Sequence, residues 1–269
     1  MSLILHPAFP SQFVAPRQIE VWLPPSYETD SDRRYAVLYM HDGQNVFNPA
    51  TSTHKIPWGV NEAMIRLRGD NKAREAIVVA AWCQPTKRLA EYMPQKAFNT
   101  PRGTRKLKHF TALFGAPFSD AYLQFIIEEL KPFIDTTYRT LPKQPDTLIM
   151  GSSMGGLISL YALCEYPHIF GGAGCVSTHW VIGEGLVVEY MKETLPPPGQ
   201  HRLYFDYGTA GKDAPYEPYQ RQADDILQAA GYQPGVDWLT QKFPGAEHNE
   251  KAWRARVHIP LAFLLGNSS

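Results

Sequence analysis

Short apolar segments alternate with longer segments of helical periodicity along the chain, and this alternation restricts the fold more than any other feature. Segment 76–82, for example, is a continuous apolar run, as expected for a strand buried on both faces. Strands are predicted at 19–23, 35–40, 76–82, 147–150, 172–176, 202–207 and 238–243, and helices at 58–68, 120–138, 154–166, 185–194, 218–230 and 250–265. This order is typical of an α/β fold, in which helices cover both faces of a mostly parallel sheet.

Local residues mark the ends of some of these helices. Asp120 is suited to cap the start of helix 120–138, and Pro132 is expected to bend or end that helix. Gly231 is suited to end helix 218–230. Because no repeat or low-complexity linker interrupts the chain, a single domain over residues 1–269 is expected, with a possible lid-like insertion around 92–119.

Composition excludes several classes of protein. The 26 basic and 26 acidic residues balance, which disfavours a nucleic-acid partner. No apolar run is long enough to span a membrane, and the apolar patch in residues 1–18 is too short and uncharged for a signal peptide. The cysteines are odd in number, lie in apolar stretches and are expected to be buried free thiols: Cys83, Cys164 and Cys175. A cytoplasmic location is therefore expected.

The segment Gly151-Ser-Ser-Met-Gly155 fits the pattern G-x-S-x-G. The pattern alone is weak, but here it leaves a predicted strand and enters a predicted helix with apolar residues at helical spacing. This is the context that a nucleophile elbow requires, with Ser153 exposed on a strained turn. The dipole of the following helix favours developing negative charge at the same place. Ser152 occupies the variable position and is expected to be structural.

A serine hydroxyl needs a histidine to take its proton, and that histidine needs a carboxylate to orient it. In α/β-hydrolases the order along the chain is serine, acid, histidine. His248 is the favoured base because it lies in a polar loop between the last strand and the last helix. The other downstream histidines remain alternatives: His168, His179, His201 and His258.

The acid is expected after strand 202–207. Asp213 lies in a loop beyond the end of that strand, where the active-site groups of open α/β sheets gather. Asp206 is its rival, although it lies within the strand and is more readily explained as a capped or solvent-facing residue. Glu217 is a third candidate.

A tetrahedral intermediate needs two backbone donors. One is expected to be the amide of Met154. The other is expected from the loop 41–45, where Gly43 permits a tight turn that directs the amide of Gln44 inward. His41 and Asp42 could also be catalytic, but they precede the serine, and the downstream pair already completes the set.

Taken together, these segments resemble the putative-esterase family of α/β-hydrolases, which includes esterase D, feruloyl and acetylxylan esterases, enterochelin esterases and mycolyltransferases. The matching segments are Leu38-Tyr-Met-His-Asp-Gly-Gln-Asn45, Arg88-Leu-Ala-Glu-Tyr-Met-Pro94, Glu128-Glu-Leu-Lys-Pro-Phe-Ile-Asp135, Gly151-Ser-Ser-Met-Gly-Gly156, Tyr204-Phe-Asp-Tyr-Gly208 and His248. The resemblance implies a triad of Ser153, Asp213 and His248, with the amides of Gln44 and Met154 as the oxyanion hole.

Indications of the substrate are fewer. The stretch from 92 to 119 contains several cations and no acid, so it could be a lid that attracts an anionic substrate or simply a solvated loop. Trp180, Tyr92 and Trp58 are expected to bind substrate, and Phe47 and Tyr216 also flank catalytic loops. Aromatic walls suit aryl, sugar or siderophore-like esters.

The prediction is a serine carboxylic-ester hydrolase that acts through an acyl-enzyme on Ser153, with a small-molecule ester as its partner. Transfer of the acyl group to an alcohol by the same triad, and a non-catalytic binding module on the same fold, are the alternatives. Neither a metal nor an organic cofactor is expected, since no short-spaced histidine pair such as H-E-x-x-H occurs.

Overall fold

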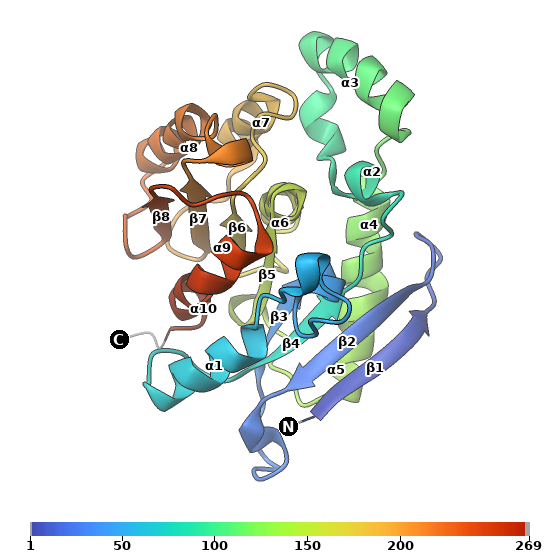
Figure 1. Cartoon of the computed structure of the whole chain (residues 1–269), viewed down its shortest axis with the longest axis vertical. Coiled ribbons are helices and arrows are strands. Elements are labelled where there is room, and N and C mark those ends of the chain that lie inside the picture. The colour runs from blue at the N-terminus through green and yellow to red at the C-terminus, as the bar shows by residue number, and fades with distance from the viewer. Residues whose placement is uncertain (1, 267–269) are drawn as a thin grey trace.

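The computed structural model describes residues 2–266, and an eight-stranded sheet forms its centre (Figure 1). The strand order is β1-β2-β4-β3-β5-β6-β7-β8. The strands are β1 (Ser2–Phe9), β2 (Arg17–Leu23), β3 (Ala36–Met40), β4 (Ala76–Ala81), β5 (Thr147–Ser152), β6 (Gly172–Val176), β7 (Arg202–Gly208) and β8 (Trp238–Phe243). β2 pairs antiparallel with both β1 and β4, and the strands from β4 through β8 pair parallel. The predicted mostly parallel sheet is confirmed.

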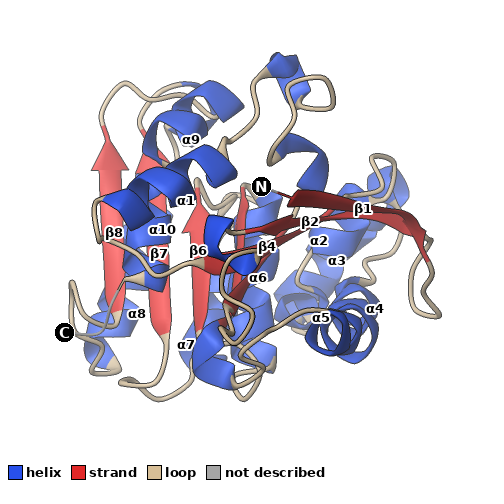
Figure 2. Ribbon diagram, turned by 90° about the horizontal axis from the view of Figure 1, so that it is seen from below, coloured by secondary structure: helices blue, strands red, loops and turns tan. Residues whose placement is uncertain are grey.

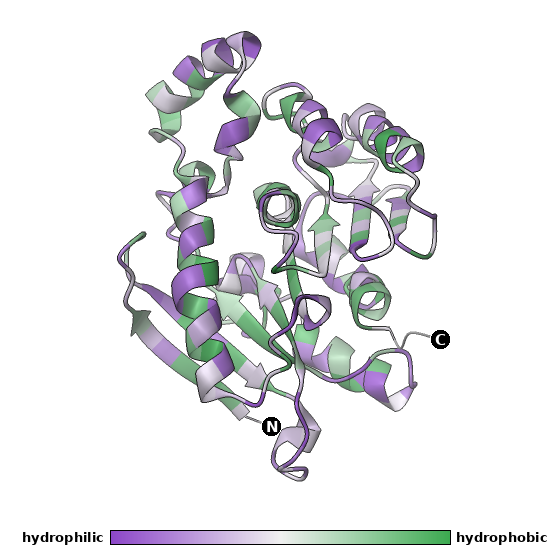
Figure 3. Ribbon diagram, turned by 180° about the vertical axis from the view of Figure 1, so that it is seen from behind, coloured by the Kyte–Doolittle hydropathy of each residue, from purple (hydrophilic) through white to green (hydrophobic). Residues whose placement is uncertain are grey.

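Two hydrophobic clusters lie on the two faces of this sheet, and helices cover both. The helices are α1 (Val60–Gly69), α2 (Arg88–Tyr92), α3 (Pro101–Phe114), α4 (Ser119–Gln124), α5 (Lys131–Thr137), α6 (Met154–Glu165), α7 (Leu186–Thr194), α8 (Glu217–Ala229), α9 (Glu250–Arg256) and α10 (His258–Leu265). Side chains of α1, α9 and α10 belong to one cluster, and those of α4, α6, α7 and α8 to the other. Figure 3 shows green, apolar strands beneath helices that are partly purple on their outer sides.

Strand β1 was missed by the sequence analysis. It forms the edge of the sheet against β2, and its residues alternate between partly buried and exposed. Leu3 and Leu5 point outward and are 43% and 54% exposed, whereas Ile4 packs against the core. The sequence does not alternate between apolar and polar residues here, because Leu3, Ile4 and Leu5 are all apolar, so the period of two appears only in the folded structure. His6 is paired with the hydroxyl of Tyr138 at 3.0 Å.

Helix α6 was predicted to be amphipathic, with one apolar face, but it is buried all round. Every residue from Met154 to Cys164 is buried. The helix contacts β5 and β6 on one side and α2 and α7 on the other. A helix that is apolar on all sides needs such an enclosed place. The start of α6, which follows Ser153 directly, is therefore held firmly in the middle of the molecule.

Two predicted helices differ in detail from the structure. Residues 119–137 pass through a π-helical segment, Phe125–Leu130, before Pro132, so this proline does not end the helix. Asp120 is not the cap: its backbone amide donates to Gln95 Oε1 at 3.2 Å, and its carboxylate accepts a hydrogen bond from Tyr161. The predicted helix 250–265 is split at Val257, because Pro260 has no amide to donate four residues back.

The carboxyl ends of the parallel strands meet at one edge of the sheet, as Figure 2 shows for β8 and the strands beside it. The loops after β3, β5, β6, β7 and β8 therefore lie close together. They contain most of the candidate residues from the sequence. Helix α9 begins at this edge, with Asn249 Oδ1 capping it through the amide of Ala252 at 3.0 Å.

A buried ion pair attaches α9 to β7. Arg256 donates to both carboxylate oxygens of Asp206, from Nη2 at 2.8 Å and from Nε at 3.2 Å. Both side chains are almost completely buried. The neighbouring Arg254 makes an ion pair with Glu62 on the surface instead. The two arginines therefore attach the same helix through one buried and one exposed ion pair.

We expect Arg256→Met to lower the free energy of unfolding by about 3–5 kcal/mol, because it leaves the Asp206 carboxylate buried without its cation. Arg254→Met is the matched control and should cost under about 1 kcal/mol, since exposed ion pairs contribute little. Urea unfolding followed by circular dichroism measures both. Equal losses in the two variants would contradict this assignment of the buried pair.

Candidate active site

Ser153 lies on a sharp turn between β5 and α6. Its backbone has φ 60° and ψ −120°, a conformation that non-glycine residues rarely adopt. Gly151 makes the turn possible, because a Cβ there would lie 2.9 Å from the backbone of Gly155. The amide of Ser153 donates to Val176 O at 2.9 Å, which joins the turn to β6. This is the local geometry of a nucleophile elbow.

The amide of Met154 follows as the first residue of α6. The first amides of a helix have no acceptor within the helix, and the helix dipole adds a partial positive charge at that end. An anion that forms beside Ser153 would therefore be stabilised by the free amides and by the helix dipole.

The structure brings His248 and Asp213 together. His248 Nδ1 lies 2.5 Å from Asp213 Oδ1. The other carboxylate oxygen accepts from the amide of Gly208 and from Ser177 Oγ, each at 2.7 Å. Burial by itself would raise the pKa of Asp213, but the hydrogen bonds from His248, Ser177 and Gly208 hold it below its ordinary value. Asp213 is therefore a buried carboxylate that remains ionised and orients the imidazole.

The rival acids have other partners. Asp206 accepts hydrogen bonds from Ser177, Tyr204 and Arg256, and none of these is a histidine. It is completely buried, so the expectation that it caps or faces solvent is wrong. Glu217 pairs with Arg221 and Lys242 near the surface.

The other downstream histidines also have separate surroundings. His201 Nε2 lies 2.9 Å from Pro167 O, and His168 packs on Tyr166. His258 starts α10 and lines a different pocket, which Ser153 does not border. His179 is different, because its ring centre lies 6.3 Å from that of His248.

A pocket of about 520 Å³ opens at this edge of the sheet, and both Ser153 and His248 line it. Its wall also includes Asp42, Gln44, Asn45, Thr53, His54, Cys83, Pro85, Arg88, Ser152, Lys212, Asn249, Glu250 and Trp253. Trp253 was missed by the sequence analysis. Its ring packs edge-on against His248 with centres 5.0 Å apart. Most of the residues on its wall have polar side chains, and two of them, Lys212 and Arg88, are cations.

Loop 41–45 leaves β3 and borders the same pocket. Asp42 has a left-handed backbone, at φ 55°, and Gly43 begins the short helical turn Gly43–Asn45 that follows it. A glycine is required at position 43, because a Cβ there would lie 2.7 Å from the backbone of Ala80. The side chain of Gln44 is turned away to Cys83, with Nε2 3.0 Å from Sγ.

An ion pair holds this loop. Arg88 donates to both oxygens of the Asp42 carboxylate at 2.7 Å. The amide of Asp42 donates to the hydroxyl of Tyr92 at 3.2 Å. Burial by itself would raise the pKa of Asp42, but Arg88 keeps it below its ordinary value. The strained residue is thus held by its side chain and by its backbone.

His41 lies behind the loop, in the core. Its Nδ1 is 2.8 Å from the hydroxyl of Tyr122, and Nε2 is buried without a partner among the described residues. Burial lowers the pKa of His41 to about 3. It does not line the pocket, so the alternative in which it acts as a base has no support from the geometry.

The three aromatic residues predicted to bind substrate are not on the pocket wall. Trp180 is buried, and its Nε1 donates to Gln220 at 3.0 Å. Tyr92 is fully buried against loop 41–45, and Trp58 packs on Trp253 with ring centres 5.6 Å apart. Their large apolar surfaces are used in the core, so direct substrate contact does not fit this structure.

The basic stretch is largely helical, not a loop. Figure 1 draws α3 at the edge of the molecule beyond α2. Several of its cations have acidic partners from other segments: Lys96 pairs with Glu165, Arg102 with Glu189 and Lys106 with Glu184. The helix borders a second pocket of about 800 Å³ that Ser153 does not line. A lid function for residues 92–119 stays a prediction.

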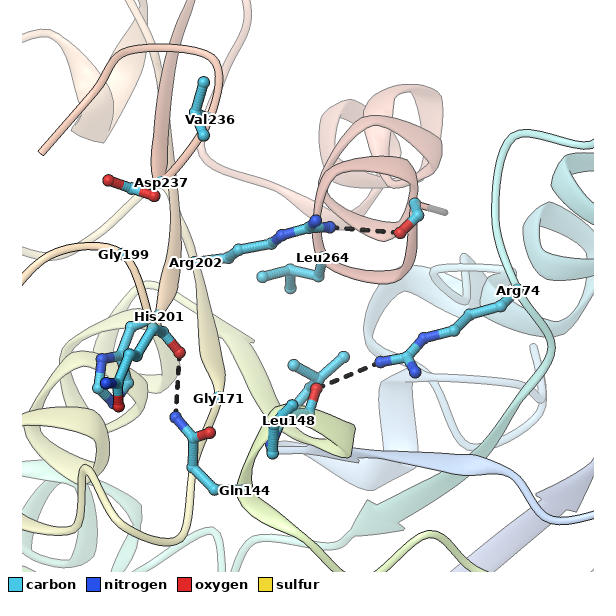
Figure 4. A pocket seen from close by; sticks show the side chains of 13 residues that line it. Arg74, Gln144, Leu148, Gly171, Gly199, His201, Arg202, Val236, Asp237 and Leu264 are labelled. Carbon is cyan, nitrogen blue, oxygen red and sulfur yellow. Dashed lines mark hydrogen bonds between the residues drawn. The ribbon is translucent and has the colours of Figure 1, made fainter. Parts of the chain in front are cut away.

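A further pocket lies at the opposite edge of the sheet, near the starts of β5, β6 and β7 (Figure 4). Its polar side chains mostly bind the protein itself. Arg202 donates to Phe263 O at 3.1 Å, Gln144 to Gln200 O at 3.0 Å and Arg74 to Pro145 O at 3.2 Å. This pocket is remote from the loops that hold Ser153 and is not the candidate active site.

Other expected features concern metals, membranes and thiols. Within residues 2–266, no group of three or more His, Cys, Asp or Glu side chains is arranged to hold a metal ion. No helix in that range has the length and apolar character needed to cross a membrane. The prediction that the three cysteines are buried free thiols is confirmed.

With this geometry established, comparison with known proteins gives the family. The model of the family described as putative esterase matches residues 11–260. The chain belongs to the putative esterase family. It is therefore an enzyme, a carboxylic ester hydrolase, as the sequence analysis predicted.

Two relatives of this esterase match very different shares of the chain. The uncharacterized protein YbbA of Bacillus subtilis (strain 168) is 26% identical over 196 residues, which are 72% of this chain and 68% of the relative. The uncharacterized protein YjcH of the same organism is 40% identical over 57 residues, only 21% of this chain and 23% of the relative.

Solved structures share the fold of the esterase. A ferulic acid esterase has a TM-score of 0.67 and 19% identity, with 98% of each chain covered. An IroE-like serine hydrolase from Shewanella oneidensis has a TM-score of 0.72 and 18% identity, covering 97% of this chain and 78% of that one. The enterobactin esterase FES from Shigella flexneri has a TM-score of 0.70 and 17% identity, covering 98% of this chain and 59% of that one. The predicted α/β-hydrolase fold is confirmed.

The buried His41 predicts an acid-dependent loss of stability. The folded protein keeps His41 neutral down to about pH 3, whereas the unfolded chain takes up the proton near pH 6.5. The contribution of neutral His41 to the free energy of unfolding is complete above pH 6.5 and is lost as the pH falls toward 3. We expect His41→Asn to reduce the pH slope of the free energy of unfolding by up to about 1.4 kcal/mol per pH unit in this window.

Urea unfolding between pH 7 and pH 4 measures this slope. His109→Asn, at an exposed position on α3, is the control and should leave the slope as in the wild type. An unchanged slope in the His41 variant would show that another group takes up the proton.

Proposed function

We propose that this esterase hydrolyses its substrate through an acyl-enzyme on Ser153, with His248 as general base and Asp213 as the acid that orients it. The observation that carries the proposal is the pairing of His248 with a buried, ionised Asp213 in a pocket that Ser153 also lines. The strained backbone of Ser153 supports it, because strain of this kind is typical of elbows that expose a nucleophile.

Hydrolysis would proceed in two steps. His248 takes the proton of Ser153 as the serine oxygen attacks the ester carbonyl, and it then delivers that proton to the leaving alcohol. A water molecule repeats the sequence on the acyl-enzyme and releases the acid. The amides of Gln44 and Met154 would hold the oxyanion, supported by the helix start at Met154 and by the loop that Arg88 and Asp42 hold.

The proposed substrate is a small to medium ester. Two structural neighbours are named for ferulic acid and enterobactin, which indicates aryl or siderophore-like esters as candidates. The pocket itself supports a polar ester, because Lys212, Arg88 and Asn45 are on its wall. Sugar esters fit the same description.

We also infer three properties that follow from the sequence. The chain forms one domain over residues 1–269, because a single sheet spans the described part. Its three unpaired cysteines support a reducing compartment, the cytoplasm. The chemistry as derived needs a serine, a histidine and a carboxylate, and requires neither a metal nor an organic cofactor.

A fluorophosphonate probe tests the nucleophile directly. We expect the wild type to be labelled and Ser153→Ala to be neither labelled nor active, with kcat lower by roughly 10³- to 10⁶-fold. Ser152→Ala is the matched control, because Ser152 is adjacent, lines the same pocket and should still permit labelling. Mass spectrometry of the labelled peptide identifies the serine. A folded wild type without label would contradict Ser153 as the nucleophile.

A second pair of variants tests the acid. Asp213→Asn should lower kcat by about 10³- to 10⁴-fold, because an amide favours the wrong tautomer of His248. Asp206→Asn is the control, since Asp206 binds Arg256 and not His248. It should lower the thermal midpoint and leave kcat within about tenfold of the wild type. The reverse pattern would assign the role to Asp206.

A further inference from the structure

His179 lies directly beside the proposed triad, yet the mechanism above does not use it. It follows β6, and its backbone amide donates to Ser153 O at 3.2 Å. Its ring centre is 6.3 Å from that of His248. The main chain thus holds residue 179 beside the nucleophile, and its ring lies near that of the base.

One side of the His179 ring is occupied. Nδ1 lies 2.5 Å from the hydroxyl of Tyr216, whose side chain is fully buried. The hydroxyl has no other hydrogen-bond partner among residues 2–266. If Nδ1 carried the imidazole proton, the phenol proton would be buried without an acceptor, which costs about 1–3 kcal/mol. The favourable arrangement has Tyr216 donating to Nδ1.

This arrangement requires a neutral imidazole, and the surroundings supply one. Burial lowers the pKa of His179 to about 4, with a further contribution from the nearby His248. Burial also raises the pKa of Tyr216, so the phenol keeps its proton. Near neutral pH the single proton of the His179 ring is then on Nε2.

Nε2 is the free side of the ring. It makes no hydrogen bond to any described residue and is not among the buried polar atoms that lack a partner. The side chain as a whole is only partly exposed. His179 is not among the residues that line the pocket of Ser153, but its partly exposed ring lies beside His248 and offers one N–H donor there.

We propose that His179 is a specificity-determining residue that donates a hydrogen bond from Nε2 to an oxygen in the alcohol portion of the ester. This rests on the proposed function, in which His248 delivers its proton to the leaving alcohol. A donor that flanks His248 is near that alcohol. The substrate class is an ester of a polyol or a hydroxy acid, with an oxygen a few bonds from the scissile one.

Tyr216 is a positioning residue in this proposal. Its ring packs edge-on against His248 with centres 5.8 Å apart, and its amide donates to Asp213 O at 2.9 Å. The same side chain thus contacts His248 and sets the tautomer of His179. Sequence alone could not assign this role, because 37 residues separate Tyr216 from His179.

The test compares esters that differ only in one oxygen. 2-Hydroxyethyl benzoate and propyl benzoate have the same length, and the ratio of their kcat/KM values reports the hydrogen bond. We expect the wild type to prefer the hydroxyethyl ester and His179→Leu to reduce this preference by about 3- to 10-fold. His179→Gln keeps an N–H near the position of Nε2 and should restore most of the preference.

A matched pair with the oxygen on the acid side, propyl 3-hydroxypropanoate and propyl butanoate, should give the same ratio in every variant. A preference that is unchanged in His179→Leu overturns the proposal, as does a change confined to the acid-side pair. If no ester is hydrolysed and the fluorophosphonate probe does not label Ser153, the proposed function itself fails. Hydrolysis of plain esters without the preference refutes only the role of His179.

Nitrogen NMR of labelled histidine gives a readout that does not depend on activity. His179 should have a protonated Nε2 and an unprotonated Nδ1 at pH 7, and Tyr216→Phe should mix the two tautomers. A protonated Nδ1 in the wild type would overturn the proposal.

Discussion

Ser177 is the junction on which the proposed site depends. Its amide donates to Asp206 and its hydroxyl donates to Asp213. The same hydroxyl accepts from Arg256 and from the indole of Trp253, at 2.8 and 3.0 Å. One small side chain therefore connects the buried ion pair below the site with the carboxylate that contacts His248. Arg256, Asp206 and Asp213 each make hydrogen bonds in this region, which is the condition for burying charge, and Nη1 is the one nitrogen of the Arg256 guanidinium without a partner among the described residues.

The network also explains why two similar carboxylates behave differently. Burial is the largest influence on the pKa of both Asp206 and Asp213 and raises it. In Asp206 the opposing influence of Arg256 is not enough, and the pKa stays above its ordinary value. In Asp213 the hydrogen bonds prevail, and the pKa falls below it. The sequence analysis favoured Asp213 from its place after the strand, but the partners that distinguish the two acids are Arg256 in α9 and His248 in the 243–249 loop.

The fold was predictable because period and order are local properties. The seven predicted strands and the parallel sheet follow from apolar runs such as 76–82. Ser153 and His248 followed from their places between a strand and a helix. The roles of Trp180, Tyr92 and Trp58 were not predictable in this way, because an aromatic residue near a catalytic loop serves the core as readily as the pocket. Arg88 and Trp253 were missed as pocket residues, since only the folded chain brings them to Asp42 and His248.

Backbone strain at the sheet edge shows where the fold departs from what is locally favourable. Asp42, Ser153 and Ser177 all have positive φ angles of 55°, 60° and 41°, and each follows directly or closely on a parallel strand. None of them is glycine, so each conformation is held at a cost of order 1–3 kcal/mol. The contacts that hold these residues differ. Arg88 and Tyr92 hold Asp42, and the hydrogen bond from the Ser153 amide to Val176 O holds Ser153. The buried acids hold Ser177. Three residues at the starts of neighbouring loops are thus strained, and each is held by its own set of contacts. This strain does not stabilise the fold. It is explained if the side chain of Ser153, the amides beside Asp42 and the acid bonded to Ser177 must meet at one point, which the proposed acyl transfer requires.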